Sequence, residues 1–289
     1  MNRWRKNRHR KAVEETPPPQ SGGEQEPLVR LRLPSFTLLF RPFGYFAAAL
    51  RFLTIMPLPG KIGTTEEELA HAVLFFPLVG LLLGCVAVLA AKMLFLFLPP
   101  LPAAILTTFV LLAFSGGLHL DGLADTADGF FSARTSERML EIMKDSSIGT
   151  MGAIALVLLL LLKATCLASL TDQLLPAVFL MPIAGRAAIL LLMAMLPYVR
   201  EEGLGRLFAA YFNSGAAWAA SLLGFLLLTW AAYAAAGPQG MAAVLATLLQ
   251  TFLFAFFCRC KIGGATGDTL GAACELAEVA AALAFTLKI

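Results

Sequence analysis

Runs of about eighteen or more apolar residues recur along this chain and constrain its fold more than any other feature. A helix needs about 20 such residues to cross the hydrocarbon core of a bilayer. A chain that crosses a bilayer must be helical or a closed barrel, because backbone polar groups cannot stay unpaired in lipid. These runs are continuous rather than alternating, which excludes the barrel. Seven segments are candidate spans: about 70–98, 101–118, 151–171, 174–196, 214–236, 241–258 and 269–287.

The composition supports the same fold class. Hydrophobic residues make up 58% of the chain and charged residues 14%, whereas a soluble domain carries nearer a quarter charged residues. Residues 35–55 are apolar but interrupted by arginines, which favours a helix lying in the membrane interface. The sequence therefore predicts an all-α, polytopic integral membrane protein with about seven transmembrane helices and an N-terminal interfacial helix.

The chain divides into a polar start and an apolar remainder. Residues 1–34 are basic and rich in proline. They lack the apolar stretch of a cleaved signal peptide, so we do not expect them to be one. We expect them to form a disordered cytoplasmic tail whose charge touches anionic lipid. Residues 35–289 are expected to form a single transmembrane catalytic domain.

Two kinds of connection join the candidate spans, and they alternate along the chain. One kind is short and almost uncharged, reading PPL, TDQ and GPQG. The other is longer and rich in Lys and Arg, as in YVREEGLGR and CRCKIGGATGD. Cytoplasmic connections carry an excess of Lys and Arg. We therefore expect a multi-pass protein of the cell inner membrane, with its N-terminus, every charged loop and the active site on the cytoplasmic side.

Three aspartates follow the second candidate span within eight residues: Asp121, Asp125 and Asp128. On a helix these positions fall within an arc of roughly 60°, so that their carboxylates point one way. Hard oxygen ligands on one helical face suit Mg²⁺, which also binds substrate phosphates. The alternative is a solvated helix end, since aspartate is common in loops. The spacing beside a membrane favours the metal site.

A further helix is predicted over residues 133–149, ARTSERMLEIMKDSSIG. Its charged residues Arg134, Arg138, Glu141 and Asp145 recur at helical spacing and would share one face. One interpretation is a ladder of ion pairs, each worth a few tenths of a kcal/mol. In the other, the arginines bind phosphate oxygens while Asp145 completes the metal site or acts as a base.

A glycine-rich turn introduces the last candidate span, in KIGGATGDTLGAACELAE, residues 261–278. Thr266 or Asp268 can cap the helix that follows, and such a turn can bind an anion at the helix N-terminus. It is not a P-loop, because the G-x-x-x-x-G-K-[ST] spacing is absent. Taken alone, the turn is only a weak indication of an anion-binding site.

Four charged residues lie inside the predicted spans: Lys163, Arg186, Glu275 and Glu278. Charges in hydrocarbon are rare and usually pair with one another. The two acids and the two bases lie at similar depths, about 10–15 Å from the helix ends at 1.5 Å per residue. This placement predicts a buried neutralising cluster beneath the cytoplasmic site, with a transport path as the alternative.

Five motifs occur in order along the chain: RFLTIMP (51–57), FFPLVGLLLG (75–84), GGLHLDGLADTADG (116–129), LEIMKDSSIGTMG (140–152) and GGATGDTLGAACELAE (263–278). Together they resemble the cobalamin synthases, the adenosylcobinamide-GDP ribazoletransferase family, over most of the chain. The resemblance implies the last step of nucleotide-loop assembly in cobalamin biosynthesis. α-Ribazole, or its 5′-phosphate, would attack the phosphorus bonded to cobinamide in adenosylcobinamide-GDP. GMP would leave, and adenosylcobalamin or its 5′-phosphate would form.

The resemblance also implies a Mg²⁺-dependent enzyme, which suits a reaction in which metal and arginine offset phosphoryl charge. Expected partners are the two substrates and membrane lipid, without nucleic acid, and a homo-oligomer is left open. The expected catalytic residues and Mg²⁺ ligands are Asp121, Asp125, Asp128 and Asp145. The expected substrate contacts are His119, Arg134, Arg138, Lys144, Gly264, Thr266 and Asp268.

Two other functions have some support. CDP-alcohol phosphotransferases carry a D-x2-D-G-x2-A-R motif, and Asp125-x2-Asp128-Gly129 begins in that way. Here three residues precede Ala133-Arg134, and the later G-x3-D-x3-D is absent. A transporter is the alternative from another class, and it would move a solute without releasing GMP.

Overall fold

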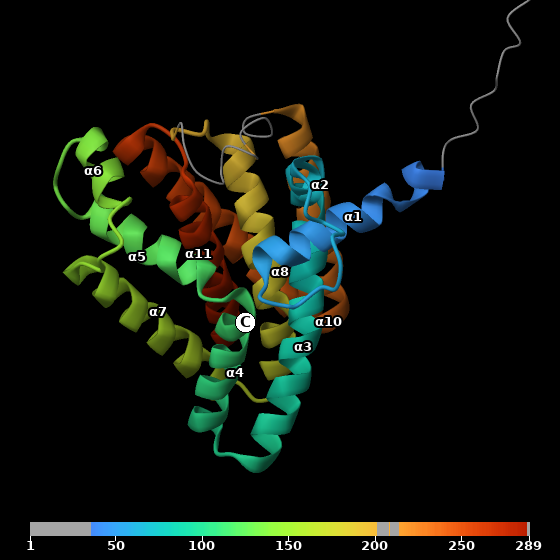
Figure 1. Ribbon diagram of the computed structural model, residues 1–289. Coiled ribbons are helices and arrows are strands. Elements are labelled where there is room, and N and C mark those ends of the chain that lie inside the picture. The colour runs from blue at the N-terminus through green and yellow to red at the C-terminus, as the bar shows by residue number, and fades with distance from the viewer. Residues whose placement is uncertain (1–35, 201–207, 209–213, 288–289) are drawn as a thin grey trace, which may run out of the picture. The chain divides into compact units, whose positions relative to one another are not determined.

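The computed structural model describes residues 36–200, 208 and 214–287. The chain divides into a short unit, Met1–Leu38, and a large one, Leu39–Ile289, and the predicted tail 1–34 lies outside the described residues. No β-strand forms within the described ranges, which confirms the all-α class. The helices are α1 (Phe36–Leu53), α2 (Glu66–His71), α3 (Phe76–Phe97), α4 (Pro100–Ser115), α5 (Leu118–Phe130), α6 (Ser136–Ile142), α7 (Thr150–Ser169), α8 (Leu174–Met195), α10 (Gly215–Ile262) and α11 (Gly267–Thr286), with a 3-10 helix at Ala72–Phe75 (Figure 1).

Five helical segments among the described residues are long and apolar enough to cross a membrane. They are α7, α8, α10, α11 and the segment Glu66–Phe97, in which α2 and the 3-10 helix lead into α3. α4 and α5 pass the same test only as a pair, and the chain bends by 93° between them. α5, which carries the aspartates, therefore lies outside the five spans. The membrane class is confirmed, whereas the count of seven spans stays a prediction.

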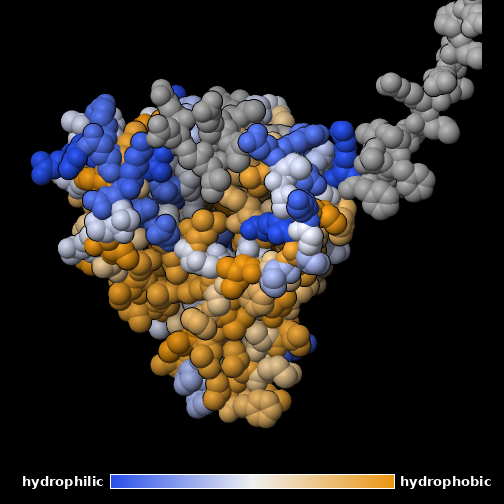
Figure 2. All heavy atoms as spheres, viewed as in Figure 1, coloured by the Kyte–Doolittle hydropathy of each residue, from blue (hydrophilic) through white to orange (hydrophobic). Residues whose placement is uncertain are grey.

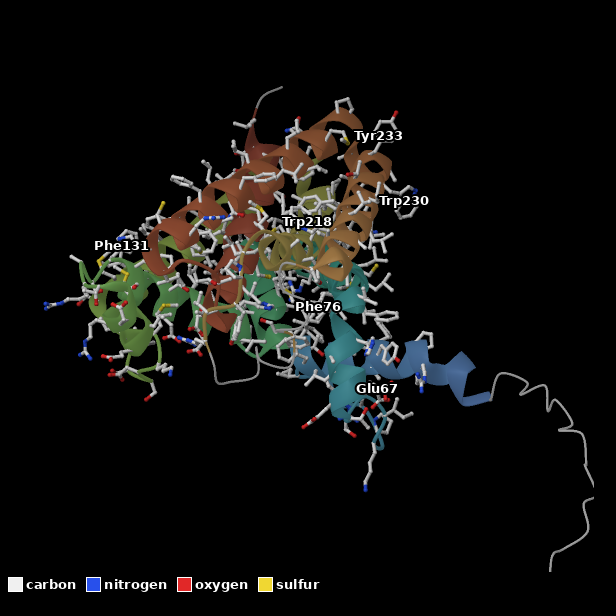
Figure 3. The ribbon with its side chains drawn as sticks, turned by 90° about the horizontal axis from the view of Figure 1, so that it is seen from above. Glu67, Phe76, Phe131, Trp218, Trp230 and Tyr233 are labelled. Atoms are coloured by element: carbon white, nitrogen blue, oxygen red, sulfur yellow. The ribbon has the colours of Figure 1, made fainter. Side chains whose placement is uncertain are left out.

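α10 is too long for one crossing. Its 48 residues would measure about 72 Å if straight, more than twice the thickness of a bilayer core. The backbone leaves helical geometry at Gly237, where φ is 55° and ψ is −130°, values that only glycine adopts without steric cost. Gly240 then lies against the backbone carbonyl of Ala232. The helix therefore reverses at the predicted connection GPQG, and its two halves meet near Tyr233 (Figure 3).

The helices of the large unit differ in how much of their surface is buried. Of the apolar window of each helix, 89% is buried in α8 and 78% in α11, against 33% in α7 and 39% in α10. α8 packs against α3, α10 and α11, and so forms the centre of the core. Hydrophobic residues cover the outer surface of α3, α4 and α7, and hydrophilic residues gather around α2 and α6 (Figure 2). This distribution is what a bundle surrounded by lipid requires.

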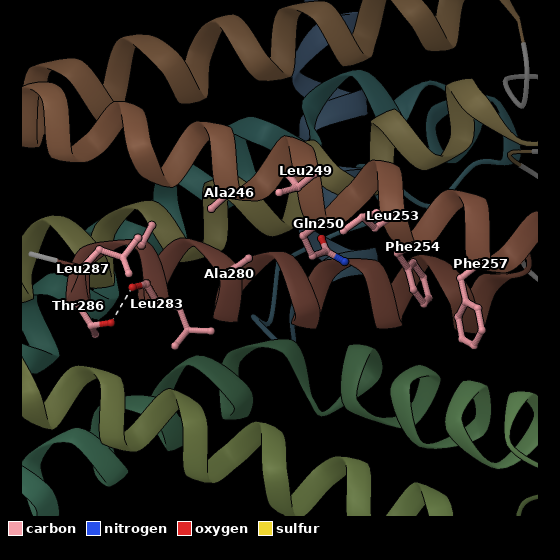
Figure 4. Close-up of a pocket in the computed structure, with 11 residues that line it drawn as sticks. Ala246, Leu249, Gln250, Leu253, Phe254, Phe257, Ala280, Leu283, Thr286 and Leu287 are labelled. Atoms are coloured by element: carbon pink, nitrogen blue, oxygen red, sulfur yellow. Dashed lines mark hydrogen bonds between the residues drawn. The ribbon is translucent and has the colours of Figure 1, made fainter. Parts of the chain in front are cut away.

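An apolar groove of about 660 Å³ runs between the second half of α10 and α11 (Figure 4). Its polar lining residues are Gln250 and Thr286, and the Thr286 hydroxyl donates to the Leu283 carbonyl at 2.7 Å. None of the residues that line it is charged. Because it offers no charged side chain to a phosphate or a cation, we place the candidate site elsewhere.

Candidate active site

Contacts with neighbouring helices fix the position of α5. Gly122 lies against the backbone of Asp268 in α11, and a Cβ atom at Gly122 would come within 2.7 Å of the Asp268 carbonyl oxygen. Glycine alone permits this approach. At the other end of α5, Lys261 Nζ donates to the Phe130 carbonyl at 2.7 Å, a favourable place for a cation. The aspartates of α5 are therefore held beside the beginning of α11.

The three carboxylates of α5 have different surroundings. Asp121 is exposed, whereas Asp125 and Asp128 are half-buried. Burial, and then the negative charges of Asp268 and Asp121, raise the pKa of Asp125 to about 7. Negative charge is thus concentrated around Asp125, between α5 and the first turn of α11.

Asp128 is bonded to the backbone of α7. Its Oδ2 accepts a hydrogen bond from the Gly149 N–H at 2.7 Å, and its Oδ1 accepts one from the Gly152 N–H at 2.8 Å. The first N–H groups of a helix lack partners within the helix, and the positive end of the helix dipole favours an anion there. Asp128 therefore joins α5 to α7, and each of its carboxylate oxygens accepts one hydrogen bond from the backbone.

We expect Asp128→Asn to lower the stability of the protein. The amide keeps one acceptor oxygen but turns an NH₂ group towards a backbone N–H, so one donor loses its partner, at about 1–3 kcal/mol. Thermal unfolding of the purified protein in detergent measures this loss. Asp145→Asn is the matched control, because Asp145 is exposed and its side chain accepts its hydrogen bonds from Ser147, two residues further along. Equal unfolding temperatures for the two variants would contradict the capping role.

A cavity of about 230 Å³ opens beside Asp121 and Asp268. Arg200 also lines it, and its guanidinium lies 2.6 Å from the Asp268 carboxylate, with side chains 14% and 19% exposed. Arg200 and Asp268 thus form an ion pair at the cavity. His119 lines the same cavity, and its Nε2 has no hydrogen-bond partner among the described residues. Convergent polar groups in a largely apolar cavity are typical of a small-molecule site.

A second hollow, of about 440 Å³, also reaches Asp121. It is lined by the turn between α4 and α5, by Ala124 and by Ile148 and Leu156 near the start of α7. Asp121 and Leu118 line both cavities. Two cavities that meet at one carboxylate provide places for two substrates to come together.

The helix predicted over residues 133–149 is shorter than expected. Ala133 adopts a φ of 54° and Thr135 caps the first turn, so α6 covers only Ser136–Ile142. Arg134 lies before the helix and Asp145 after it, and the expected four-residue face does not form.

Within α6, Arg138 pairs with Glu141 at 2.5 Å, and both side chains are 62% exposed. An exposed pair of this kind contributes about 0.3–0.5 kcal/mol. Of the ladder that the sequence suggested, the described residues show the one pair Arg138–Glu141.

The remaining charged residues of this segment lie away from the cavities. Asp145 Oδ1 accepts hydrogen bonds from the hydroxyl and the backbone N–H of Ser147, at 2.6 and 2.9 Å, and these bonds lower the pKa of Asp145. Arg134 and Lys144 are exposed. None of Asp145, Arg134 and Lys144 lines either cavity beside Asp121.

The glycine-rich turn before α11 caps that helix as predicted. Thr266 Oγ1 accepts a hydrogen bond from the backbone N–H three residues later, at 3.2 Å. Thr266 and Gly264 are buried, and Ala265 between them bonds through its backbone to residues 197 and 199, at 2.8 and 3.0 Å. Of the three substrate contacts predicted in this turn, only Asp268 lines the cavity.

No group of three or more His, Cys, Asp or Glu side chains is arranged to hold a metal ion in the part of the chain that the structure describes. The four predicted ligands are therefore not assembled into one site. Asp128 caps α7, and Asp145 closes its own turn. Asp121 and Asp125 remain together, with Asp268 close to Asp125. We call these three residues the acidic cluster.

The predicted cluster of buried charges is confirmed. Lys163 Nζ donates to Glu275 and to Glu278 at 2.6 Å each, and Arg186 donates to Glu278 at 2.7 Å. The four side chains come from α7, α8 and α11, and none is more than about a twentieth exposed. Two cations balance two anions, with Glu278 bonded to both cations.

Other residues that line the cavity beside Asp121 were not predicted. Arg200 follows α8, and three phenylalanines, Phe52, Phe76 and Phe208, come from segments far apart in the sequence. No spacing rule connects residues so distant. The loop motif YVREEGLGR gave the one available signal, because it placed Arg200 among the charges of a predicted cytoplasmic loop.

The fold and the site define a polytopic helical membrane protein with an acid-lined cavity. The chain belongs to the cobalamin-5-phosphate synthase family, whose model matches residues 45–286.

Relatives of this chain are named adenosylcobinamide-GDP ribazoletransferase. The relative in Roseiflexus sp. (strain RS-1) is 39% identical over 247 residues, which are 86% of this chain and 91% of the relative. The relative in Escherichia coli (strain K12) is 39% identical over 83% of this chain and 98% of its own length. The relative in Shigella boydii serotype 4 (strain Sb227) is 40% identical over the same shares. No solved structure matches. The family match favours a transferase of cobalamin synthesis over a CDP-alcohol phosphotransferase and over a transporter.

Proposed function

We propose that this chain is an adenosylcobinamide-GDP ribazoletransferase, the enzyme of the last nucleotide-loop step in cobalamin biosynthesis. A ribose hydroxyl of α-ribazole, or of its 5′-phosphate, attacks the phosphorus bonded to cobinamide in adenosylcobinamide-GDP. The new oxygen–phosphorus bond forms while the anhydride bond to GMP breaks. GMP leaves, the hydroxyl proton passes to a carboxylate of the acidic cluster, and adenosylcobalamin or its 5′-phosphate is released.

The meeting of two cavities at Asp121 is the observation that carries this proposal. The reaction joins two substrates, and each needs a place beside the reacting phosphorus. In phosphoryl transfer the protein takes little part in the covalent chemistry. Catalysis comes from positioning the substrates and from offsetting the charge on the phosphoryl oxygens. Asp121 can orient the attacking hydroxyl, and Arg200 supplies a positive charge in the same cavity.

Mg²⁺ is the cofactor that we propose for this site. Mg²⁺ usually binds through one or two carboxylates together with waters and substrate phosphates, so it does not need a cage of four carboxylates. Asp121 and Asp125 would hold it, with Asp268 adjoining, and their surplus of negative charge suits a divalent cation. When bound, the ion would offset the charge that spreads over the phosphoryl oxygens.

Mixing the purified protein with adenosylcobinamide-GDP, α-ribazole and Mg²⁺ tests the activity. We expect GMP and adenosylcobalamin to form in equal amounts. A CDP-alcohol phosphotransferase would release CMP from a CDP-alcohol instead, and a transporter would release no nucleotide. Folded protein that releases no GMP under these conditions would overturn the proposal.

We propose that the protein lies in the cell inner membrane and that its active site is on the cytoplasmic side. The hydrophilic surface around α2 and α6 supports this orientation, as do the Lys and Arg residues of the adjoining loops (Figure 2). Trp230 and Tyr233 lie beside the reversal of α10, are 67% and 68% exposed and point outward (Figure 3). Such residues gather at membrane interfaces, which suits a turn at the opposite surface.

Cysteine labelling in intact cells tests this orientation. In a background without the exposed Cys85 and Cys260, we expect Ser136→Cys to react only after the membrane is opened. Ala235→Cys, beside the reversal of α10, should react with an impermeant reagent from outside. Labelling of the Ser136→Cys variant in intact cells would reverse the proposed orientation.

A further inference from the structure

Three phenylalanine rings form one wall of the cavity beside Asp121. Phe52 in α1 and Phe76 in α3 are stacked, with ring centroids 5.9 Å apart and 14° between their planes. Phe208 meets both rings edge-on, at 5.1 and 6.0 Å. Phe76 and Phe208 are buried, and Phe52 is half-buried. We call these three rings the aromatic wall.

The polar lining of the same cavity comes from other elements. His119 and Asp121 lie in the first turn of α5, Asp268 lies in the first turn of α11, and Arg200 follows α8. The cavity therefore combines an aromatic part with a charged part. A ligand that fits both is flat and apolar at one end and polar at the other.

We propose that this cavity binds the acceptor nucleoside, with its base against the aromatic wall and its ribose towards Asp121. This inference rests on the proposed function, in which α-ribazole is the acceptor. The base of α-ribazole is a dimethylated benzimidazole, a flat fused ring system whose single free ring nitrogen accepts a hydrogen bond. Aromatic rings favour the offset and edge-on contacts that the wall offers. The ribose hydroxyls then lie beside the carboxylate that both cavities share.

The polar groups of the cavity distinguish this base from guanine, the other aromatic base in the reaction. Guanine carries several donors and acceptors, and burying them against phenylalanine rings without partners is costly. Benzimidazole needs one donor. Arg200 lines the cavity, and its guanidinium nitrogens only donate hydrogen bonds, so Arg200 supplies that donor.

The size of the cavity supports the same assignment. Its volume of about 230 Å³ is below the range of about 300–1,000 Å³ that drug-sized ligands occupy. A corrinoid is much larger than such ligands and cannot enter. A fused two-ring base can enter, with its ribose near the mouth.

Binding of α-ribazole to the purified protein, measured by calorimetry without adenosylcobinamide-GDP, tests the inference. We expect 5,6-dimethylbenzimidazole to compete with α-ribazole and GMP not to compete. Phe208→Leu should weaken α-ribazole binding roughly fivefold to tenfold. Phe285→Leu, at an equally buried ring near the end of α11 and outside the cavity, is the matched control and should leave binding unchanged. If Phe208→Leu does not fold, Phe52→Leu at the half-buried ring replaces it.

Kinetics provide a second measurement in the same variants. Phe208→Leu should raise the KM for α-ribazole by a similar factor and leave the KM for adenosylcobinamide-GDP unchanged. Competition by GMP, or a raised KM for adenosylcobinamide-GDP alone, would overturn the inference. Protein that binds α-ribazole through the aromatic wall but never releases GMP would support the inference and contradict the proposed function, so the two failures are distinguishable.

Discussion

Asp121→Asn and Asp125→Asn should each lower turnover by roughly a hundredfold or more, equivalent to about 3 kcal/mol in the activation free energy. Asparagine keeps the size and polarity of aspartate but removes the negative charge that a hard cation requires. Folding should survive, because Asp121 is exposed and because the acids around Asp125 repel its charge. GMP release across a Mg²⁺ titration measures the loss, with thermal unfolding followed in parallel.

Asp145→Asn is the matched control for both variants. It makes the same chemical change at an exposed aspartate that lines neither cavity. We expect near wild-type turnover and an unchanged Mg²⁺ requirement. If Asp121→Asn and Asp125→Asn behaved as this control does, the metal proposal would fail while the assignment of the reaction could still stand.

The spanning helices could be predicted closely, because continuous hydrophobicity is a local property of the sequence. The segment expected at 151–171 is α7, Thr150–Ser169, and the one expected at 174–196 is α8, Leu174–Met195. The uncharged connection GPQG marked the reversal of α10 at Gly237. Hydropathy did not show that α5 turns by 93° away from α4, since this depends on how the two helices pack.

The buried charges could also be predicted, for an energetic reason. A single charge in hydrocarbon is so costly that a partner at the same depth is almost required. Acids and bases at matched positions along the spans were therefore enough to predict that Lys163, Arg186, Glu275 and Glu278 pair with one another.

The roles of individual site residues were harder to predict. Asp128 shares a helical face with Asp121 and Asp125, but which partner it meets depends on the start of α7 lying against α5. Asp145 was assigned to a helical face that ends before it, because α6 stops at Ile142. The residues that line the cavity with Asp121, such as Arg200, depend on contacts between distant segments.

Glu278→Ala should cause the largest loss of stability, because Glu278 bonds to two buried cations. The substitution leaves Arg186 without its carboxylate in a medium of low dielectric constant, at a cost of about 3–5 kcal/mol. Glu275→Ala should cost less, because Lys163 keeps its bond to Glu278. The folded fraction after size-exclusion chromatography and the unfolding temperature measure both losses. Equal losses would contradict this arrangement, in which Glu278 pairs with both cations and Glu275 pairs with Lys163.

Paired substitutions show whether the charges act on one another as the contacts indicate. Adding Arg186→Leu to Glu278→Ala removes the unpaired cation and leaves Lys163 bonded to Glu275, so part of the stability should return. Adding Lys163→Leu instead also balances the charge, but it leaves Arg186 and Glu275, between which the structure shows no ion pair among the described residues. We expect this second pair to recover less. Because both double variants have the same net charge, a larger recovery with Arg186→Leu can come only from the arrangement of the contacts. Equal recovery would mean that net charge alone stabilises this part of the membrane domain.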